Sequence, residues 1–487
     1  MHTKIQISWH TLACFAVFVV SAWYYVGNAI ANLEPNQFGY DFQLRYNETK
    51  CVLSGRDPFL IWIGQQNFPP YLSFDKAASM IDGNHEYVGA YPPWEYPLMT
   101  PFALLPKWVA LVLFFMLEVL CSLVLVIWSV FAGWRLHGRL GDGFLCGAVA
   151  VMPAYYVVYC LNYLNFGVMI AVATVCLACC LDKERPILAG ICWAMMMVKP
   201  QIALLFVIPL LIGKRYRAIC VAAGICLLLT AVSAIVCGRS PVAMILAVGR
   251  CRGMFPKCYL LGPVVTEWLH GISPMLPHVL NAVIGVFVCF VLSWRFRRFD
   301  GWLMKLLPAV MLCWLWSVSR FYDQSMLVVA FATMALWLLR HNFHWQFWVA
   351  LGALTLQAVM LHTNCVVLSW ISLFAVIGSF AMLVLTRSRM LMVGSAASVI
   401  SFSLVSLFPN LNEDVAFPIM VLSLLAFHFA SSRLEVCLIV IGAAFACIIV
   451  EMSQWACSPV LYFLEFALLY QLSRQNISRR KLKSEML

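Results

Sequence analysis

The chain has 487 residues, of which 63% are hydrophobic and only 11% are charged, and its formal net charge is +11. Soluble domains carry roughly a quarter charged residues, so this composition and a mean hydropathy of +0.88 exclude a water-soluble globule. Only helices and closed barrels satisfy their backbone polar groups in lipid. The apolar runs here are long and unbroken rather than alternating, so the composition predicts an all-α polytopic membrane protein.

The positive charge does not indicate a nucleic-acid partner, because Lys and Arg are spread between apolar segments instead of gathered on one surface. The 20 cysteines lie mostly inside apolar runs and define neither a disulfide framework nor a metal site. The chain contains no P-loop and no Rossmann glycine motif. We therefore expect no cofactor and no bound metal.

Five regions follow one another along the chain. Residues 1–31 are predicted to form the first transmembrane helix, and residues 32–101, which are polar and rich in aromatics, a large first extracytoplasmic loop. A transmembrane core (102–340), additional C-terminal transmembrane helices (341–472) and a basic cytoplasmic tail (473–487) complete the chain. Placing the short basic loops in the cytoplasm gives about 14 to 16 membrane segments with both termini inside.

Within the core, an apolar run near 187–213 is interrupted at Lys199-Pro200. Each half has about 13 residues, or ~20 Å of helix, which is too short to span a bilayer. Proline ends a helix, and irregular backbone at membrane depth requires a polar cavity. This segment is therefore predicted to be a hairpin of short helices with Lys199 at its turn, and residues 237–277 are predicted to form a second outer loop.

Asp41 is the first candidate for chemistry. It follows the first helix closely and stands among aromatic residues, Tyr40 and Tyr46 included. A partly desolvated carboxylate at the membrane surface can act as a general base near neutral pH. The structural alternative is a loop aspartate or the N-cap of a following helix.

Lys199 is the second candidate, because an ionisable side chain within an apolar segment is functional by default. A lone cation beside the Gln201 amide suits a phosphate better than a metal. The alternative is a lysine that extends to the membrane interface.

Further polar residues are expected on the same outer side as Asp41. Arg320 is suited to gripping phosphate oxygens, and the others are candidates for binding a sugar or an acceptor. These others are Tyr91, Glu95, Asn162, Asn165, Tyr322, Asp323 and Gln324. The structural alternatives are an ion pair between Arg320 and Asp323, interhelical hydrogen bonds from the asparagines and a proline-rigidified membrane boundary around Tyr91.

Taken in order, these motifs resemble glycosyltransferase family 87, a bacterial group of polytopic GT-C-type enzymes that includes polyprenyl-phosphomannose-dependent mannosyltransferases. The resemblance extends over residues 35–340. It rests on Tyr40-Asp41-Phe42 with Tyr46, on residues 53–59, on the proline-rich segment 91–106, on Lys199-Pro200-Gln201 with the basic stop 214–217, and on Tyr322-Asp323. Where members often show Gly-Gln-x-Asn, this chain has Asn162-Tyr163-Leu164-Asn165, and only Asn165 matches.

The resemblance implies a GT-C-like bundle in the cell (inner) membrane. The implied reaction is the inverting, metal-independent transfer of a mannose-like hexose or a pentose from a polyprenyl-phosphate-linked donor to a lipid or glycan acceptor on the extracytoplasmic side. Asp41 would be the general base, while Lys199 and Arg320 would bind the donor phosphate. The sugar or acceptor would be bound by Tyr40, Tyr46, Tyr91, Glu95, Asn162, Asn165, Gln201, Tyr322, Asp323 and Gln324.

Two other functions remain open at this point. A lipid-linked sugar flippase or transporter would also have many spans, a broken helix and an intramembrane lysine, although no internal repeat pairs with the break at Lys199. An O-antigen-type ligase or polymerase would rely on arginines in a later loop, where this chain has Arg239, Arg250 and Arg252.

Overall fold

The computed structural model describes several stretches of the chain, and helices are the only regular elements within them. The described residues are 9–31, 33, 38–62, 91–151, 153–252, 269, 271–273, 276–313, 316 and 321–340. They confirm the predicted all-helical fold class. The chain divides into two compact units, and the elements below belong to the first, Met1–Cys258 with Ser273–His341. The predicted C-terminal helices and tail, 341–487, lie outside the described residues.

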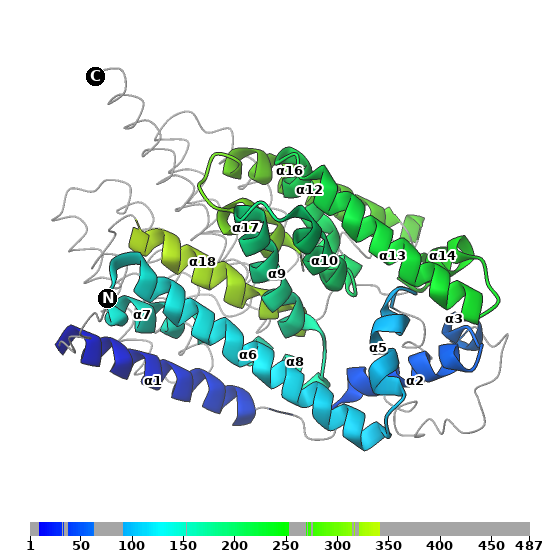
Figure 1. Cartoon of the computed structure of the whole chain (residues 1–487), viewed down its shortest axis with the longest axis horizontal. Coiled ribbons are helices and arrows are strands. Elements are labelled where there is room, and N and C mark those ends of the chain that lie inside the picture. The colour runs from blue at the N-terminus through cyan, green and yellow to red at the C-terminus, as the bar shows by residue number, and fades with distance from the viewer. Residues whose placement is uncertain are drawn as a thin grey trace, which may run out of the picture. The chain divides into compact units, whose positions relative to one another are not determined.

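Four described helices are long and apolar enough to cross a membrane (Figure 1). They are α1 (Trp9–Ala31), α6 (Lys107–His137), α13 (Tyr216–Val236) and α16 (Leu276–Phe296). A fifth candidate span is bent by 59° and consists of α7 (Leu140–Val151) with the Tyr156–Tyr163 part of α8. Helices of 21 residues or more reach about 30 Å, the thickness of the hydrocarbon layer. The fold is therefore that of a membrane protein.

The close approach of α6 and α7 depends on glycine. Helix α7 packs against both α1 and α6, and a Cβ atom added at Gly143 of α7 would lie 2.5 Å from the Val130 carbonyl oxygen of α6. A Cβ atom added at Gly147, one turn later, would lie 2.6 Å from the Val130 side chain. Small residues of this kind let membrane helices pack backbone to backbone.

The predicted first loop contains three short described helices. They are α2 (Tyr40–Leu53), α3 (Pro58–Trp62) and α5 (Glu95–Ala103), and α2 packs against α5. Helix α2 ends before Gly55, whose φ of 73° favours glycine. The Asp57 carboxylate then accepts a hydrogen bond of 2.9 Å from the backbone of Phe59 in the first turn of α3.

The apolar segment around Lys199 is broken into short pieces. Helix α9 (Gly167–Asp182) is followed by α10 (Pro186–Met196), α11 (Pro200–Ala203), the 3-10 turn η2 (Leu204–Phe206) and α12 (Val207–Ile212). Pro200 is the first residue of α11, a position where its missing N–H costs nothing. The interruption places Lys199 between two helices.

The remaining described elements complete the core of this unit. They are α14 (Pro241–Arg252), α17 (Trp302–Leu312), the 3-10 helix η3 (Phe321–Met326) and α18 (Leu327–Arg340). Helix α17 packs against α9, α16 and α18, while η3 packs against α8 (Ala154–Tyr163) and α9. This packing brings η3 to the junction of α8 and α9.

Replacing Gly143 by alanine tests the tight α6–α7 contact. The added Cβ meets the Val130 carbonyl, so we expect Gly143→Ala to lower the free energy of unfolding by about 1–3 kcal/mol. Gly224→Ala in α13 is the matched control, because its Cβ meets nothing within 4 Å and alanine favours a helix by about 0.5–1 kcal/mol. Thermal unfolding of the two purified variants measures the difference, and equal melting temperatures would contradict the close packing.

Candidate functional site

Asp41 lies in the first turn of α2, and its position depends on the glycine before it. Gly39 has a φ of 69° and donates a backbone hydrogen bond of 2.6 Å to the Asn162 carbonyl. A Cβ atom at Gly39 would lie only 2.9 Å from Leu111. The start of α2 is thereby fixed against the end of α8, and Asp41 is 8% exposed.

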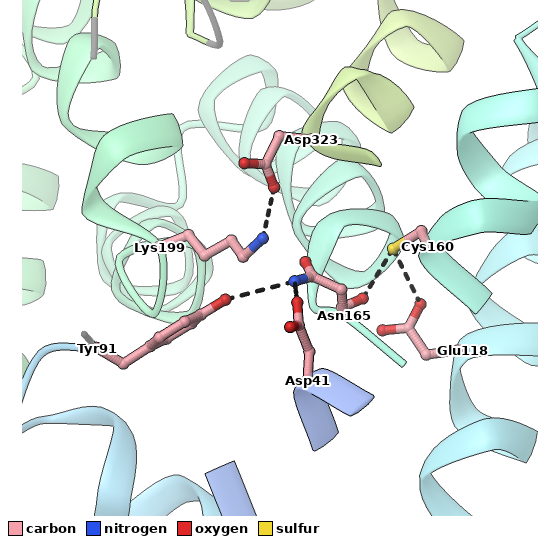
Figure 2. A network of polar contacts seen from close by, with 7 residues as sticks. All are labelled: Asp41, Tyr91, Glu118, Cys160, Asn165, Lys199 and Asp323. Carbon is pink, nitrogen blue, oxygen red and sulfur yellow. Dashed lines mark hydrogen bonds and ion pairs between the residues drawn. The ribbon is translucent and has the colours of Figure 1, made fainter. Parts of the chain in front are cut away.

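Asn165 connects Asp41 to the turn between α8 and α9. Leu164 ends α8 with a φ of 52°, an uncommon conformation for a non-glycine residue, and the buried Asn165 follows it. The Asn165 side-chain amide donates hydrogen bonds to the Asp41 carboxylate and, over 3.4 Å, to the Tyr91 hydroxyl (Figure 2). Three predicted site residues thus meet around one amide group.

Lys199 forms an ion pair with Asp323 of η3, with 2.5 Å between Nζ and Oδ1 (Figure 2). The two side chains are 1% and 2% exposed. The Trp94 indole donates a 2.8 Å hydrogen bond to the Met197 carbonyl, which ties the turn carrying Lys199 to the start of α5. Lys199 is therefore not the lone cation that the sequence suggested, and Asp323 pairs with it across 124 residues.

The Tyr91 ring contacts two cations of the site. The Arg45 guanidinium lies 4.1 Å from the ring centroid and the Lys199 ammonium 6.0 Å, distances typical of cation–π contacts. Burial raises the pKa of Tyr91, although the charges of Lys199 and Arg45 act in the opposite direction. The hydroxyl therefore keeps its proton, and while it accepts from Asn165 it can donate to another group.

Arg45 and Glu48 belong to this site although the sequence reasoning missed them. They occupy positions i+4 and i+7 from Asp41, so all three side chains share one face of α2. Arg45 Nη1 and Glu48 Oε2 are 2.6 Å apart and both residues are buried. The sequence alone provides no signal for this, because the charged face of a helix ordinarily faces solvent.

Glu95, the first residue of α5, is 0% exposed. Within the described parts of the chain, neither of its carboxyl oxygens has a hydrogen-bond partner. Burial raises the pKa of Glu95 well above 4.5; Arg45 and Lys199 oppose this shift, whereas Glu48 and Asp41 add to it. Burial therefore favours the neutral acid, which can donate a hydrogen bond.

Glu118 was also missed, and it is the single acidic residue of α6. It is fully buried, and the Cys160 thiol of α8 lies 3.9 Å from its Oε2 atom (Figure 2). A lone carboxyl group in a long apolar helix is itself a signal of function.

Several other predicted residues make structural contacts. The Tyr46 hydroxyl donates a 2.8 Å hydrogen bond to the Leu105 carbonyl, and the Gln201 carbonyl accepts one of 2.5 Å from the Trp316 indole. Asn162 is buried and holds Gly39 through its carbonyl, while Tyr40 is half-buried beside Asp41 in the chain. Tyr46 makes its contact through the side-chain hydroxyl, whereas Asn162 and Gln201 make theirs through the backbone carbonyl.

The segment from Arg320 to Gln324 is only partly described. Asp323 and Gln324 are buried, and the Gln324 Oε1 atom has no hydrogen-bond partner among the described residues. Arg320 and the Tyr322 side chain lie outside what the structure describes, so the alternative ion pair between Arg320 and Asp323 does too. No group of three or more His, Cys, Asp or Glu residues that could hold a metal occurs in the described ranges.

The fold and the site define a membrane protein with a buried cluster of acidic, basic and amide groups. Residues 90–315 match the model of glycosyltransferase family 87. This match confirms the predicted resemblance to that family and supports a membrane glycosyltransferase. The matched range contains Tyr91, Asn165 and Lys199, whereas Asp41 precedes it and Asp323 follows it. No curated protein and no solved structure matches the chain.

Removing one partner of the Lys199–Asp323 pair tests its contribution to stability. Lys199→Met leaves the Asp323 carboxyl buried without its cation, so we expect a loss of about 3–5 kcal/mol in unfolding free energy. The double variant Lys199→Met/Asp323→Leu should recover most of this loss, because apolar pairs replace buried ion pairs well. Thermal or denaturant unfolding of the purified protein measures both effects.

The control is the ion pair between Arg215 and Glu184, which are 3.8 Å apart with Glu184 80% exposed. Glu184→Gln should leave the melting temperature unchanged, because exposed pairs contribute little. A double variant at Lys199 and Asp323 that is as unstable as Lys199→Met alone would contradict the pairing.

Proposed function

We propose that the protein transfers a mannose-like hexose or a pentose from a polyprenyl-phosphate-linked donor to a lipid or glycan acceptor, with Asp41 as general base. The observation that carries this proposal is the grouping of Asp41, Asn165, Tyr91 and Lys199 at one place. It combines a carboxylate that can take a proton with a cation that can bind a phosphate. A single displacement at the anomeric carbon uses the carboxylate for the acceptor proton and the cation for the leaving phosphate.

The proposed step conserves atoms and electrons. The acceptor hydroxyl oxygen attacks the anomeric carbon while its proton moves to the Asp41 carboxylate. The bond between the anomeric carbon and the phosphate oxygen breaks, and its electron pair leaves with polyprenyl phosphate. One displacement inverts the configuration of the anomeric carbon.

Asn165 supports the proposed role of Asp41. Its amide hydrogen bond restricts the rotation of the carboxylate, and a general base must lie within hydrogen-bond reach of the proton that it removes. The Tyr91 hydroxyl, on the other side of the same amide, is well placed to donate to a sugar hydroxyl. Glu95, buried nearby and favoured as the neutral acid, has the same capacity.

Lys199 is the proposed phosphate ligand. An ammonium group has three N–H donors, so Lys199 can bind Asp323 and a phosphate oxygen together. A cation fixed before the reaction stabilises charge as it develops on the leaving group, which makes a metal ion unnecessary in this mechanism. Arg320 is proposed as a second phosphate ligand because of its bidentate geometry.

The proposed site faces the extracytoplasmic side of the cell membrane. This orientation rests on the basic loops and the basic tail, which the positive-inside rule assigns to the cytoplasm together with both termini. The broken segment 187–213 is then a hairpin of short helices that carries Lys199 to the outer side.

Asp41→Asn tests the proposed base. Asparagine keeps the size of aspartate and an oxygen that accepts from Asn165, but it cannot take a proton at neutral pH. We expect the transfer rate to fall by about 10²–10⁴-fold with unchanged expression and melting temperature. The assay follows label from polyprenyl-phosphate mannose into product in membranes that contain the protein.

Asp57→Asn is the control, because Asp57 is a buried aspartate of the same loop that caps α3 and pairs with Arg239. It should keep the wild-type transfer rate. Wild-type transfer by Asp41→Asn would contradict the assignment, and movement of the labelled lipid across the membrane without bond cleavage would show a transporter.

A further inference from the structure

Cys160 holds the backbone of Asn165 at two points. The Asn165 N–H donates a 3.0 Å hydrogen bond to the Cys160 carbonyl, and the Cys160 thiol lies 2.8 Å from the Asn165 carbonyl oxygen. The side chain of the same asparagine binds Asp41. The thiol and the Asp41 carboxylate therefore both contact Asn165, the thiol at its backbone and the carboxylate at its side chain (Figure 2).

Glu118 contacts the other side of this thiol. Its Oε2 atom lies 3.9 Å from the Cys160 sulfur, and its Oε1 atom has no hydrogen-bond partner within the described residues. A carboxylate that is buried and charged requires a cation. Among the described residues no cation lies within ion-pair distance of Glu118, and Lys199 is bonded to Asp323.

The Cys160 thiol has two acceptors within reach. A thiol carries one hydrogen, and both the Asn165 carbonyl oxygen and the Glu118 Oε2 atom can accept it. Cys160 therefore links the buried carboxyl group of α6 to the backbone of Asn165.

We propose that Glu118, acting through its contact with the Cys160 thiol, is a positioning residue that orients Asn165 and thereby Asp41. This inference rests on the proposed role of Asp41 as the base. Glu118 touches neither Asp41 nor Tyr91 in these contacts, so its effect reaches the reaction only through the turn at Asn165. This series of contacts explains why a carboxyl group lies buried in α6 beside the end of α8.

The proposal separates hydrogen bonding from ionisation at residue 118. Glu118→Gln keeps a side-chain oxygen that accepts from the thiol and should keep kcat within about twofold of wild type. Glu118→Met has a similar length and no oxygen acceptor, and it should lower kcat by about threefold to tenfold, the effect of one neutral hydrogen bond. The KM for polyprenyl-phosphate mannose should not change in either variant, because Glu118 is not proposed to contact the donor.

Cys160 provides a second test that does not depend on Glu118. Cys160→Ser keeps one O–H donor for the Asn165 carbonyl and should stay close to wild type, whereas Cys160→Ala should lose about as much kcat as Glu118→Met. The double variant Glu118→Met/Cys160→Ala should lose no more than Cys160→Ala alone, because both residues act through one chain of contacts. Ser129→Ala, at a buried α6 serine whose hydroxyl donates to the Leu125 carbonyl of its own helix, is the control for a general effect on α6.

The outcomes distinguish this inference from the proposed function. An inactive Asp41→Asn together with a fully active Glu118→Met would overturn the positioning role and leave the base intact. Glu118→Gln with a kcat as low as that of Glu118→Met would show that ionisation, not the hydrogen bond with Cys160, matters at this position, and would overturn the proposal. A melting temperature of Glu118→Met equal to wild type assigns the loss of kcat to positioning, because replacing a buried polar group with an apolar one of similar shape is nearly neutral for stability.

Discussion

The hydrogen bond between the Asn165 amide and the Asp41 carboxylate is the contact on which the site depends. It joins α2, from the polar segment that follows the first membrane helix, to the turn between α8 and α9 in the membrane core. The neighbouring contact from Gly39 to Asn162 fixes the same junction through the backbone. Together they hold a carboxylate that is far away in sequence beside Tyr91 and, around the Tyr91 ring, beside Lys199.

Burial determines how the charges around this junction are arranged. Lys199 pairs with Asp323 and Arg45 with Glu48, because an ion that has lost its water needs a counterion and hydrogen bonds. At Glu95 burial instead raises the pKa, which favours the neutral acid. The cluster thus offers cations for a phosphate, a carboxylate for a proton and neutral donors for hydroxyl groups, all within low-dielectric surroundings that strengthen each interaction.

Residue types predicted the fold class, the family and much of the set of polar residues that meet at the site. Apolar runs define helices by their length, and Asp41, Tyr91, Asn165, Lys199 and Asp323 are conspicuous because polar groups are rare in such a chain. The pairing of Lys199 with Asp323 was not predictable, since it depends on how η3 packs against α8 and α9. Arg45 and Cys160 were missed because their importance comes from neighbours in space, whereas Glu118 was missed although it is the single acidic residue of an apolar helix. The roles of all these residues stay proposals.

The most direct measurement is a cryo-EM density map of the purified protein with bound polyprenyl-phosphate mannose. We expect the anomeric carbon of the sugar beside the Asp41 carboxylate and the donor phosphate beside the Lys199 ammonium, with Asn165 still bonded to Asp41. A sugar bound away from Asp41, or an Asp41 carboxylate separated from Asn165 and Tyr91, would contradict the proposed site.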